Sequence, residues 1–413
     1  MKSNYKRLGD YIQTVKEKNS DLKASKLLGI NIDKFFMPSV ANVVGTDMSN
    51  YKIVKTGQFA CNRMHVGRDY RIPISLSKEE IPFMVSPAYD VFEIIDTAVL
   101  LPEYLMMWFS RKEFDRNTWF HTDADVRGGL PWSAFCDLEL PIPSIEKQQE
   151  IVKEYNIIKN RIVLNNQLIS KLEETAQAIY KQWFVDFEFP DENGKPFKSN
   201  GGKMVWCEEL EKEIPEGWKI GILSDYCSKI TKGTTPEKMF SEKSEKATVK
   251  YIKGESLKES HLFDIKKISF IDIETHKKLN RSILEELDIC YSIAGTLDKF
   301  AIVDKSILPG NTNQAIAIIR VDEAKINPYF IIGLFLSNYQ LEYYNFNIQQ
   351  AVQANLSLET ISSLPLIIPK QKIINLLGII IRKIFHAKLN IDLENRKLEE
   401  LKDLLLAKMT SVN

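Results

Sequence analysis

The chain has 413 residues, of which 44% are apolar and 27% are charged, and its formal net charge is zero. This composition is typical of a globular protein with two or three domains, and zero net charge argues against a polycation that simply coats nucleic acid. Five dispersed cysteines, an N-terminus without an apolar core and the lack of an apolar run near ~20 residues predict a soluble cytoplasmic protein.

Residues 1–145 predict a mixed α/β domain. Short β-like runs, such as Phe83–Val85 and Val91–Ile95, are separated by Gly, Pro, Asn and Asp. A helix is expected to begin at Pro102, because proline is favoured in the first turn of a helix.

Residues 146–187 predict one long helix, since neither Pro nor Gly interrupts them. The apolar residues recur in steps of three and four, which is the heptad pattern of a coiled coil. Positions seven residues apart form the first row of its seam: Ile151, Ile158, Asn165, Leu172 and Ile179. Asn165 is the polar exception, and a buried Asn in a coiled coil costs stability but fixes the register of the helices.

An aromatic cluster, Trp183–Phe187, ends this helix and is followed by a polar segment rich in Gly and Pro. Trp183 keeps its place in the seam. Phe184 and Phe187 leave the seam and are expected to pack under the next domain or against a partner protein. Residues 188–217 are predicted to be a linker rather than a core element.

Residues 218–367 predict a second mixed α/β domain, and residues 368–413 predict a second long helix. β-like runs in this domain precede a helix that is expected to begin at Pro328. The first seam row of the second long helix is predicted to contain Leu377, Ile384, Ile391, Leu398 and Leu405. The second row is filled less regularly, by Ile380, Ala387 and Leu401.

An internal repeat relates the two halves of the chain. Pro102 and Pro328 are 226 residues apart (328 − 102). The same offset is kept by Val126 and Val352, Leu130 and Leu356, Pro143 and Pro369, and Lys171 and Lys397. Leu8–Tyr11 matches Leu223–Tyr226 at the smaller offset of 215 (223 − 8), which implies different loop lengths within the two domains.

Two long helices at equivalent positions of a repeat favour pairing with each other. The chain between them must return, so an antiparallel pair is expected. The predicted fold class is therefore α/β (α+β), with two pseudo-repeated mixed α/β domains separated by two long helices that form an antiparallel coiled coil.

No convincing catalytic or metal-binding set is found in the sequence. The phosphate-binding patterns G-x-x-x-x-G-K-[ST] and G-x-G-x-x-G are absent. Asn327–Phe330 has one proline where an adenine methyltransferase motif has two, and a helix start explains it. Pro190–Asp191 is not followed nearby by the [DE]-x-K of a nuclease site, and the five histidines have no metal-ligand spacing.

Five polar segments predict a nucleic-acid surface: Arg63–Arg71, Asp123–Leu130, Lys229–Pro236, Gly310–Ala315 and Gln349–Ser357. Arg can read guanine, Asn or Gln can read adenine, and Gly/Thr loops let backbone N–H groups approach phosphates. Each segment alone also fits a solvated turn, and their recurrence on both repeats favours DNA. The candidate DNA-binding residues are His65, Arg68, Arg127, Lys232, Thr234, Thr235, Asn313, Gln314, Gln353 and Asn355.

Essentially the whole chain resembles the specificity (S) subunits of type I restriction-modification systems. The most specific stretch is LISKLEETAQAIYKQWFVDFEFP, followed by the Gly/Lys/Ser linker and the I-P-x-G-W restart at Ile214–Trp218. Weaker markers are ITKGTTP, NQA and an L-P-[IL]-P pattern before each long helix, which departs to Leu364–Pro369 in the second copy. ITKGTTP has no clear mate in the first domain, where Gln13–Lys18 aligns only loosely, so different half-sites are expected.

The resemblance implies that the two globular domains are target recognition domains, each reading one half of a split, asymmetric DNA sequence. It implies that the two long helices act as a spacer and dock two modification (methyltransferase) subunits, which restriction/translocase subunits then join. Adenine methylation, ATP hydrolysis and cleavage would belong to those partners. So would S-adenosylmethionine, ATP and Mg, and this chain would be non-catalytic and hold no cofactor.

The alternative is a coiled-coil scaffold whose two globular domains bind proteins. Changes at Arg68, Lys232 or Gln314 would alter site-specific methylation under the first hypothesis and leave it intact under the second. The target sequence, the spacer length and the partner of Asn165 do not follow from the sequence.

Overall fold

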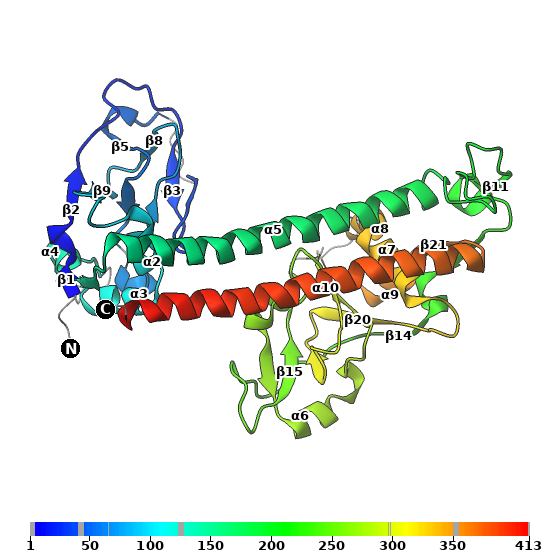
Figure 1. Ribbon diagram of the computed structural model, residues 1–413. Helices are drawn as coiled ribbons and strands as arrows, with labels where there is room; N and C mark the ends of the chain where they lie inside the picture. The colour runs from blue at the N-terminus through cyan, green and yellow to red at the C-terminus, as the bar shows by residue number, and fades with distance from the viewer. Residues whose placement is uncertain are drawn as a thin grey trace. The chain divides into compact units, whose positions relative to one another are not determined.

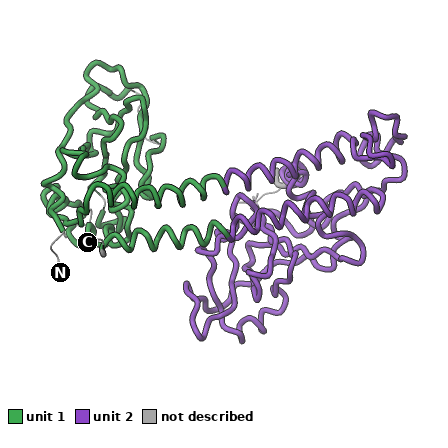
Figure 2. Tube along the Cα trace, in the orientation of Figure 1, with its two compact units in different colours: residues 1–164, 394–413 green, residues 165–393 purple. Residues whose placement is uncertain are grey.

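The computed structural model (Figure 1) describes residues 5–39, 45–64, 66–122, 128–295, 297, 299–349 and 355–411. The chain divides into two compact units (Figure 2). Unit 1 consists of residues 1–164 and 394–413, and unit 2 consists of residues 165–393. Among the described residues, no helix is both long enough and apolar enough to cross a membrane.

Unit 1 is built on a four-stranded antiparallel sheet with the strand order β2-β9-β6-β7. The strands are β2 (Ile12–Val15), β9 (Asp90–Ile94), β6 (Phe59–Cys61) and β7 (Ile74–Leu76). Phe59 lies opposite Phe92 in the register, and their rings stack at a centroid distance of 5.0 Å. Both rings also contact Phe109, and all three side chains are buried, so this cluster is the centre of the unit.

Three two-stranded pairs and four short helices complete the globular part of unit 1. The pairs are β1 (Tyr5–Arg7) with β10 (Glu139–Pro141), β3 (Leu28–Ile30) with β4 (Phe36–Pro38), and β5 (Lys52–Val54) with β8 (Phe83–Val85). The helices are α1 (Val66–Asp69), α2 (Pro102–Phe109), α3 (Lys112–Phe120) and α4 (Trp132–Asp137). The 3₁₀ turns are η1 (Leu8–Asp10) and η2 (Met48–Asn50).

Unit 2 repeats this plan with a four-stranded antiparallel sheet in the order β14-β20-β17-β18. These strands are β14 (Cys227–Lys232), β20 (Ile316–Val321), β17 (Ile289–Ser292) and β18 (Phe300–Ile302). A second sheet has the order β16-β15-β19, formed by β16 (Ser269–Ile271), β15 (Val249–Ile252) and β19 (Gly310–Thr312), and β15 and β19 are parallel. The outer pair is β13 (Lys219–Ile222) with β21 (Pro365–Ile368).

The helices of unit 2 also follow the order found in unit 1. They are α6 (Ile273–Lys278), α7 (Pro328–Leu336), α8 (Tyr339–Gln349) and α9 (Leu358–Ser362). The remaining 3₁₀ turns are η3 (Glu208–Leu210), η4 (Leu223–Tyr226), η5 (Gly254–Ser256), η6 (Ile265–Lys267), η7 (Asn280–Ser282) and η8 (Met409–Ser411), the last of which is in unit 1.

The repeat predicted from the sequence is visible element by element. The two central sheets have the same strand order, α2 and α7 both begin at a proline, and η1 and η4 contain the matching Leu8–Asp10 and Leu223–Tyr226 segments. The second sheet differs: unit 2 has a three-stranded sheet with a parallel pair, whereas unit 1 has two separate two-stranded pairs. The predicted mixed α/β fold is confirmed, and this difference accounts for the shorter offset at the start of each copy.

Two long helices run through the units: α5 (Ile145–Phe184) and α10 (Gln371–Lys408). In unit 1, Arg161 of α5 donates to both carboxylate oxygens of Glu394 on α10, at 2.9 and 3.1 Å. Tyr155, nearer the start of α5, faces the charges of Glu399 and Asp403, nearer the end of α10. Residue numbers rise along one helix as they fall along the other, so the pairing within unit 1 is antiparallel.

The ten residues predicted for the first seam rows are all buried or half-buried. The second row of α10 differs from the prediction, because Leu401 is 46% exposed. Buried side chains instead follow a row seven residues apart that includes Ile381, Lys388 and Asn395. Two of these three side chains are polar, so a search for apolar periodicity selected neighbouring residues and missed the row.

The segment predicted as a linker is folded into unit 2. Its strands β11 (Met204–Cys207) and β12 (Lys212–Pro215) form an antiparallel hairpin. Trp218 is buried and contacts Phe184 and Phe189, at ring centroid distances of 5.6 and 4.9 Å. Phe187 is also buried against Trp218, so the aromatic end of α5 packs within this domain. The expectation of a linker outside the core is wrong, because burial of these rings outweighs the local polar, turn-rich composition.

His261 gives unit 2 an expected sensitivity to acid. Its ring stacks on Phe300 at 4.0 Å, and burial, aided by the positive charge of Lys388, lowers the pKa of His261 to about 3. The unfolded chain therefore binds a proton below about pH 6.5 that the folded chain does not, and folding weakens as pH falls. We expect His261→Asn to remove about 2 kcal/mol of the stability change between pH 7 and pH 5.

Urea unfolding of the wild type and of His261→Asn at both pH values measures this difference. Asn is suitable because His261 has a φ of +55°, a left-handed conformation that Asn tolerates. Equal pH dependence in the two proteins would contradict the assignment of the effect to His261.

Candidate nucleic-acid interface

Two polar loops of unit 2 meet at the end of the central sheet. The loop Gly233–Pro236 follows β14, and the loop Asn313–Ala315 joins β19 to β20. The Thr234 N–H donates to the Thr312 carbonyl at 3.0 Å, and the Gly233 N–H donates to the Ile316 carbonyl at 3.2 Å. A Cβ at Gly233 would overlap the carbonyl oxygens of Thr312 and Asn313, so only glycine allows this approach.

The side chains of these loops form one polar surface. Thr235 donates from its hydroxyl to Oε1 of Gln314, which joins the two loops directly. Lys232, Thr235 and Gln314 are exposed, while Thr234 and Asn313 are half-buried. The structure therefore brings together five of the candidate residues, although the two loops are about 80 positions apart in the chain.

Arg281 joins this surface from η7 and was not singled out in the sequence. Its Nη2 donates to Oγ1 of Thr234 at 2.9 Å, and its side chain is exposed. The preceding helix α6 ends in His276, Lys277 and Lys278, so the only local signal was a short basic run that also fits a solvated helix.

Buried groups hold the two loops from below. The Tyr251 hydroxyl donates to the Thr234 carbonyl at 3.0 Å, and burial raises the pKa of Tyr251 to about 12, which keeps the phenol protonated as a donor. His276 contacts the side-chain oxygen of Asn311, and the Asn311 amide donates to the Leu279 carbonyl at 3.1 Å. Preorganisation of this kind reduces the entropy that loops lose when they bind a ligand.

Asn355 lies at the same end of the sheet. The N–H of the next residue, Leu356, donates to the Ile293 carbonyl at 3.1 Å, and the Ile293 N–H donates to the Ala315 carbonyl at 2.8 Å. The exposed Asn355 therefore follows a chain path that ends beside the Asn313–Ala315 loop. Gln353 falls outside the described residues.

The two candidate segments of unit 1 also meet each other. The Gly67 N–H donates to the Gly128 carbonyl at 2.8 Å, and the Leu130 N–H donates to the Arg63 carbonyl at 3.0 Å. A Cβ at Gly67 would lie only 2.9 Å from Cα of Gly128. Residues His65 and Arg127 fall outside the described part of the chain.

Arg68 is exposed on α1 and is paired with its neighbour in the chain. Its Nε and Nη2 donate to the two carboxylate oxygens of Asp69, at 2.7 and 3.0 Å, and these hydrogen bonds raise the pKa of the guanidinium. Arg63, in contrast, is half-buried, bonded to Asp90 at 2.6 Å and placed over the Trp132 ring. Arg68 is therefore available to a ligand, whereas Arg63 supports the loop.

The polar surfaces have the chemistry of binding rather than of catalysis. The described residues contain no group of three or more His, Cys, Asp or Glu side chains that could hold a metal ion. Amide, hydroxyl, guanidinium and ammonium groups dominate both surfaces, and these are the groups that contact base edges and phosphates.

Comparisons with known proteins agree with this chemistry. Residues 215–403 match the family described as Type I restriction modification DNA specificity domain. The chain is 23% identical to the Type I restriction enzyme HindI specificity subunit of Haemophilus influenzae, with 91% of each chain covered. It is 25% identical to the Type I restriction enzyme MjaIX specificity subunit of Methanocaldococcus jannaschii, with 76% of this chain and 70% of that protein covered.

A solved structure has a similar fold. The S subunit of a type I restriction-modification system from M. genitalium aligns with a TM-score of 0.55 and 12% identity, covering 98% of this chain and 95% of that chain. The sequence matches and this fold agree with the internal repeat and with the polar loop surfaces. The chain therefore belongs to the family of type I restriction-modification specificity subunits, and residues 215–403 contain its matched DNA specificity domain.

Proposed function

We propose that this chain is the non-catalytic DNA-recognition subunit of a type I complex and that it reads a bipartite, asymmetric target. The globular parts of units 1 and 2 act as target recognition domains, each for one half-site. The observation that carries this proposal is the convergence of Lys232, Thr235 and Gln314 with Arg281 on one exposed surface, which rests on a buried hydrogen-bonded support.

The side chains on this surface suit readout of the major groove. The Gln314 amide can pair with adenine, and Arg281 can pair with guanine, while Lys232 can contact a phosphate. Unit 1 presents different groups, Arg68 beside the Gly67–Gly128 contact. The two units therefore recognise different half-sites, which makes the target asymmetric.

In the proposed complex, α5 and α10 act as the spacer between the half-sites and dock two modification subunits, which restriction/translocase subunits join. Adenine methylation, ATP hydrolysis and DNA cleavage belong to these partners, together with S-adenosylmethionine, ATP and Mg. The complex acts on double-stranded DNA in the cytoplasm. A zero net charge leaves much of the phosphate contact to the partners, so the isolated chain binds DNA weakly and in a salt-sensitive way.

Mapping of methylated adenines tests this proposal. The chain and its modification subunit are expressed in a host that lacks other methylases, and long-read sequencing identifies the methylated sequence. We expect one split sequence for the wild type. With Gln314→Ala, we expect a changed or relaxed second half-site and an unchanged first half-site, because a bidentate amide contact contributes about 1–3 kcal/mol of base discrimination.

Lys305→Ala provides a control, since Lys305 is an exposed lysine outside the candidate surface. The scaffold alternative predicts that methylation by the partner survives both Gln314→Ala and Lys232→Ala with an unchanged sequence. Tight, specific binding of the cognate duplex by the isolated chain would contradict the proposed sharing of phosphate contacts.

A further inference from the structure

Two exposed phenylalanines occupy equivalent positions in the two halves of the chain. Phe120, at the end of α3, is 80% exposed, and Phe346, on α8, is 62% exposed. They are 226 residues apart (346 − 120), the offset that relates Pro102 to Pro328. One exposed phenylalanine is ordinary on a protein surface, but exposure at both copies of one position indicates a shared binding role.

Buried neighbours confirm the register of this comparison. Phe109 and Phe335 are also 226 residues apart (335 − 109), and both are fully buried in the cores of their units. The same repeat position can therefore bury its phenylalanine where the core needs one. Exposure at Phe120 and Phe346 is a property of those positions rather than an error of alignment.

In unit 1, Phe120 is continuous with the candidate DNA surface. The adjacent Trp119 contacts Tyr70 at a ring centroid distance of 5.2 Å, and Tyr70 belongs to the segment Arg63–Arg71. Tyr70 is exposed and has a φ of +56°, a strained conformation for a bulky side chain. Such strain clusters at binding sites, where the surrounding structure enforces it.

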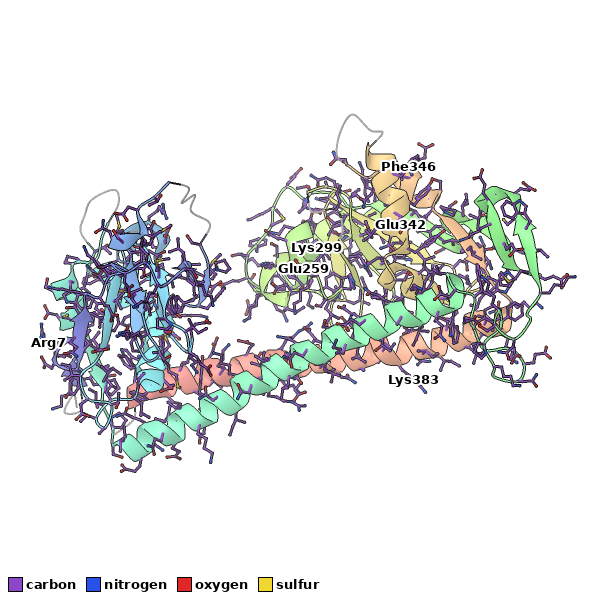
Figure 3. The ribbon with its side chains drawn as sticks, turned by 90° about the horizontal axis from the view of Figure 1, so that it is seen from above. Arg7, Glu259, Lys299, Glu342, Phe346 and Lys383 are labelled. Atoms are coloured by element: carbon purple, nitrogen blue, oxygen red, sulfur yellow. The ribbon has the colours of Figure 1, made fainter. Side chains whose placement is uncertain are left out.

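In unit 2, Phe346 precedes the corresponding polar segment. Figure 3 shows Phe346 on α8, the helix that leads into Gln349–Ser357. That segment ends at Asn355 and Leu356, beside the sheet end that carries Gln314. The Asn347 amide donates to the Tyr343 carbonyl at 2.8 Å, so the last turns of α8 are held in place around Phe346.

The charge around both phenylalanines suits a polyanion. Residues 116–121 contain Arg116 and His121 and no acidic residue, and residues 343–349 contain no acidic residue. The nearest acids, Asp115 and Glu342, lie one turn or more before the phenylalanines. An aromatic ring in an acid-free setting beside amide and guanidinium groups favours nucleic acid as the ligand.

We propose that Phe120 and Phe346 each stack against a base step of the DNA, one at each half-site. This inference rests on the proposed DNA-reading function and adds a contact that is independent of hydrogen-bond readout. Apolar side chains that enter a base step partly unstack it and bend the duplex, and the bent duplex contacts more protein surface. The two rings therefore contribute affinity and local DNA distortion, while the polar loops contribute sequence discrimination.

The test uses the assembled complex of this chain with its modification subunit and duplexes that carry the methylated sequence mapped for the wild type. 2-Aminopurine replaces single bases within and beside each half-site, away from the methylated adenines. We expect wild-type complex to raise its fluorescence at one step near each half-site. Phe120→Ala should remove the signal at one half-site only, and Phe346→Ala should remove it at the other half-site only.

Affinity for the same duplex is expected to fall roughly 10- to 100-fold with each alanine variant, the range that follows from loss of one base-stacking aromatic ring. Phe346→Tyr should restore most of the affinity and the fluorescence signal, because the tyrosine ring can stack. Phe35→Ala is the matched control, since Phe35 is an exposed phenylalanine of unit 1 outside the candidate segments, and it should match the wild type.

Unchanged affinity and fluorescence in both alanine variants would overturn the inference. So would loss of assembly with the modification subunit on size-exclusion chromatography, which would make the rings a protein-docking contact. The proposed function fails separately, if the wild-type complex neither binds nor methylates a bipartite sequence. A wild-type complex that methylates its target, with variants that behave like it, leaves that function intact and removes only the stacking contact.

Discussion

Gly233→Ala abolishes recognition of the second half-site while the rest of the chain stays folded. The added Cβ would overlap the backbone carbonyl oxygens of Thr312 and Asn313, and neither atom can move without moving its strand. The loop must therefore leave the Asn313–Ala315 loop, which separates Thr235 from Gln314 and removes Thr234 from Arg281. Loss of two or more base contacts at about 1–3 kcal/mol each corresponds to a 100-fold or greater loss of affinity for the cognate duplex.

Methylation of a cognate duplex by the complex with its modification subunit measures this effect, with thermal unfolding as the check on folding. Gly254→Ala is the matched control, because a Cβ at Gly254 would meet only Oγ of Ser292, at an ordinary 3.8 Å. Wild-type methylation of the wild-type sequence by Gly233→Ala would show that the contact between the two loops is not part of recognition.

Lys388→Ala destabilises unit 2 by about 3 kcal/mol or more, because it leaves a buried carboxylate without its partner. Lys388 is 2% exposed in the seam of α10, and its ammonium forms an ion pair with Glu173 of α5, whose side chain is 17% exposed. Burial lowers the pKa of Lys388, and the Glu173 charge opposes that shift. The pair is therefore strongly coupled, and removal of either charge alone is more harmful than removal of both.

Urea unfolding of a double-mutant cycle measures this coupling. We expect Lys388→Met together with Glu173→Leu to recover most of the stability lost by Lys388→Ala, since apolar replacements of similar volume avoid the desolvation cost of both charges. Lys383→Ala is the control on the same helix, where an exposed lysine should change the free energy of unfolding by less than about 0.5 kcal/mol (Figure 3). Additive effects of the two single changes would contradict the coupling.

The candidate surface of unit 2 was only partly predictable. Lys232, Thr235 and Gln314 stand out in the sequence because they lie in short Gly/Thr and amide-rich loops. Arg281 and Tyr251 do not stand out, because their roles depend on contacts with Thr234 made by distant parts of the chain. A basic or aromatic residue in an ordinary turn carries no local sign of the loop that it supports.

The internal repeat, the two long helices and the mixed α/β class follow from the sequence alone, because heptad spacing, Gly/Pro punctuation and a constant offset are local or periodic signals. The tertiary structure decided what those signals cannot contain. Packing around Trp218 turned a polar, turn-rich connection into part of a core, and pairing with Glu173 placed Lys388 in an apolar seam. In both cases the free energy comes from partners far away in the chain, and it outweighs the local preference of the residues themselves.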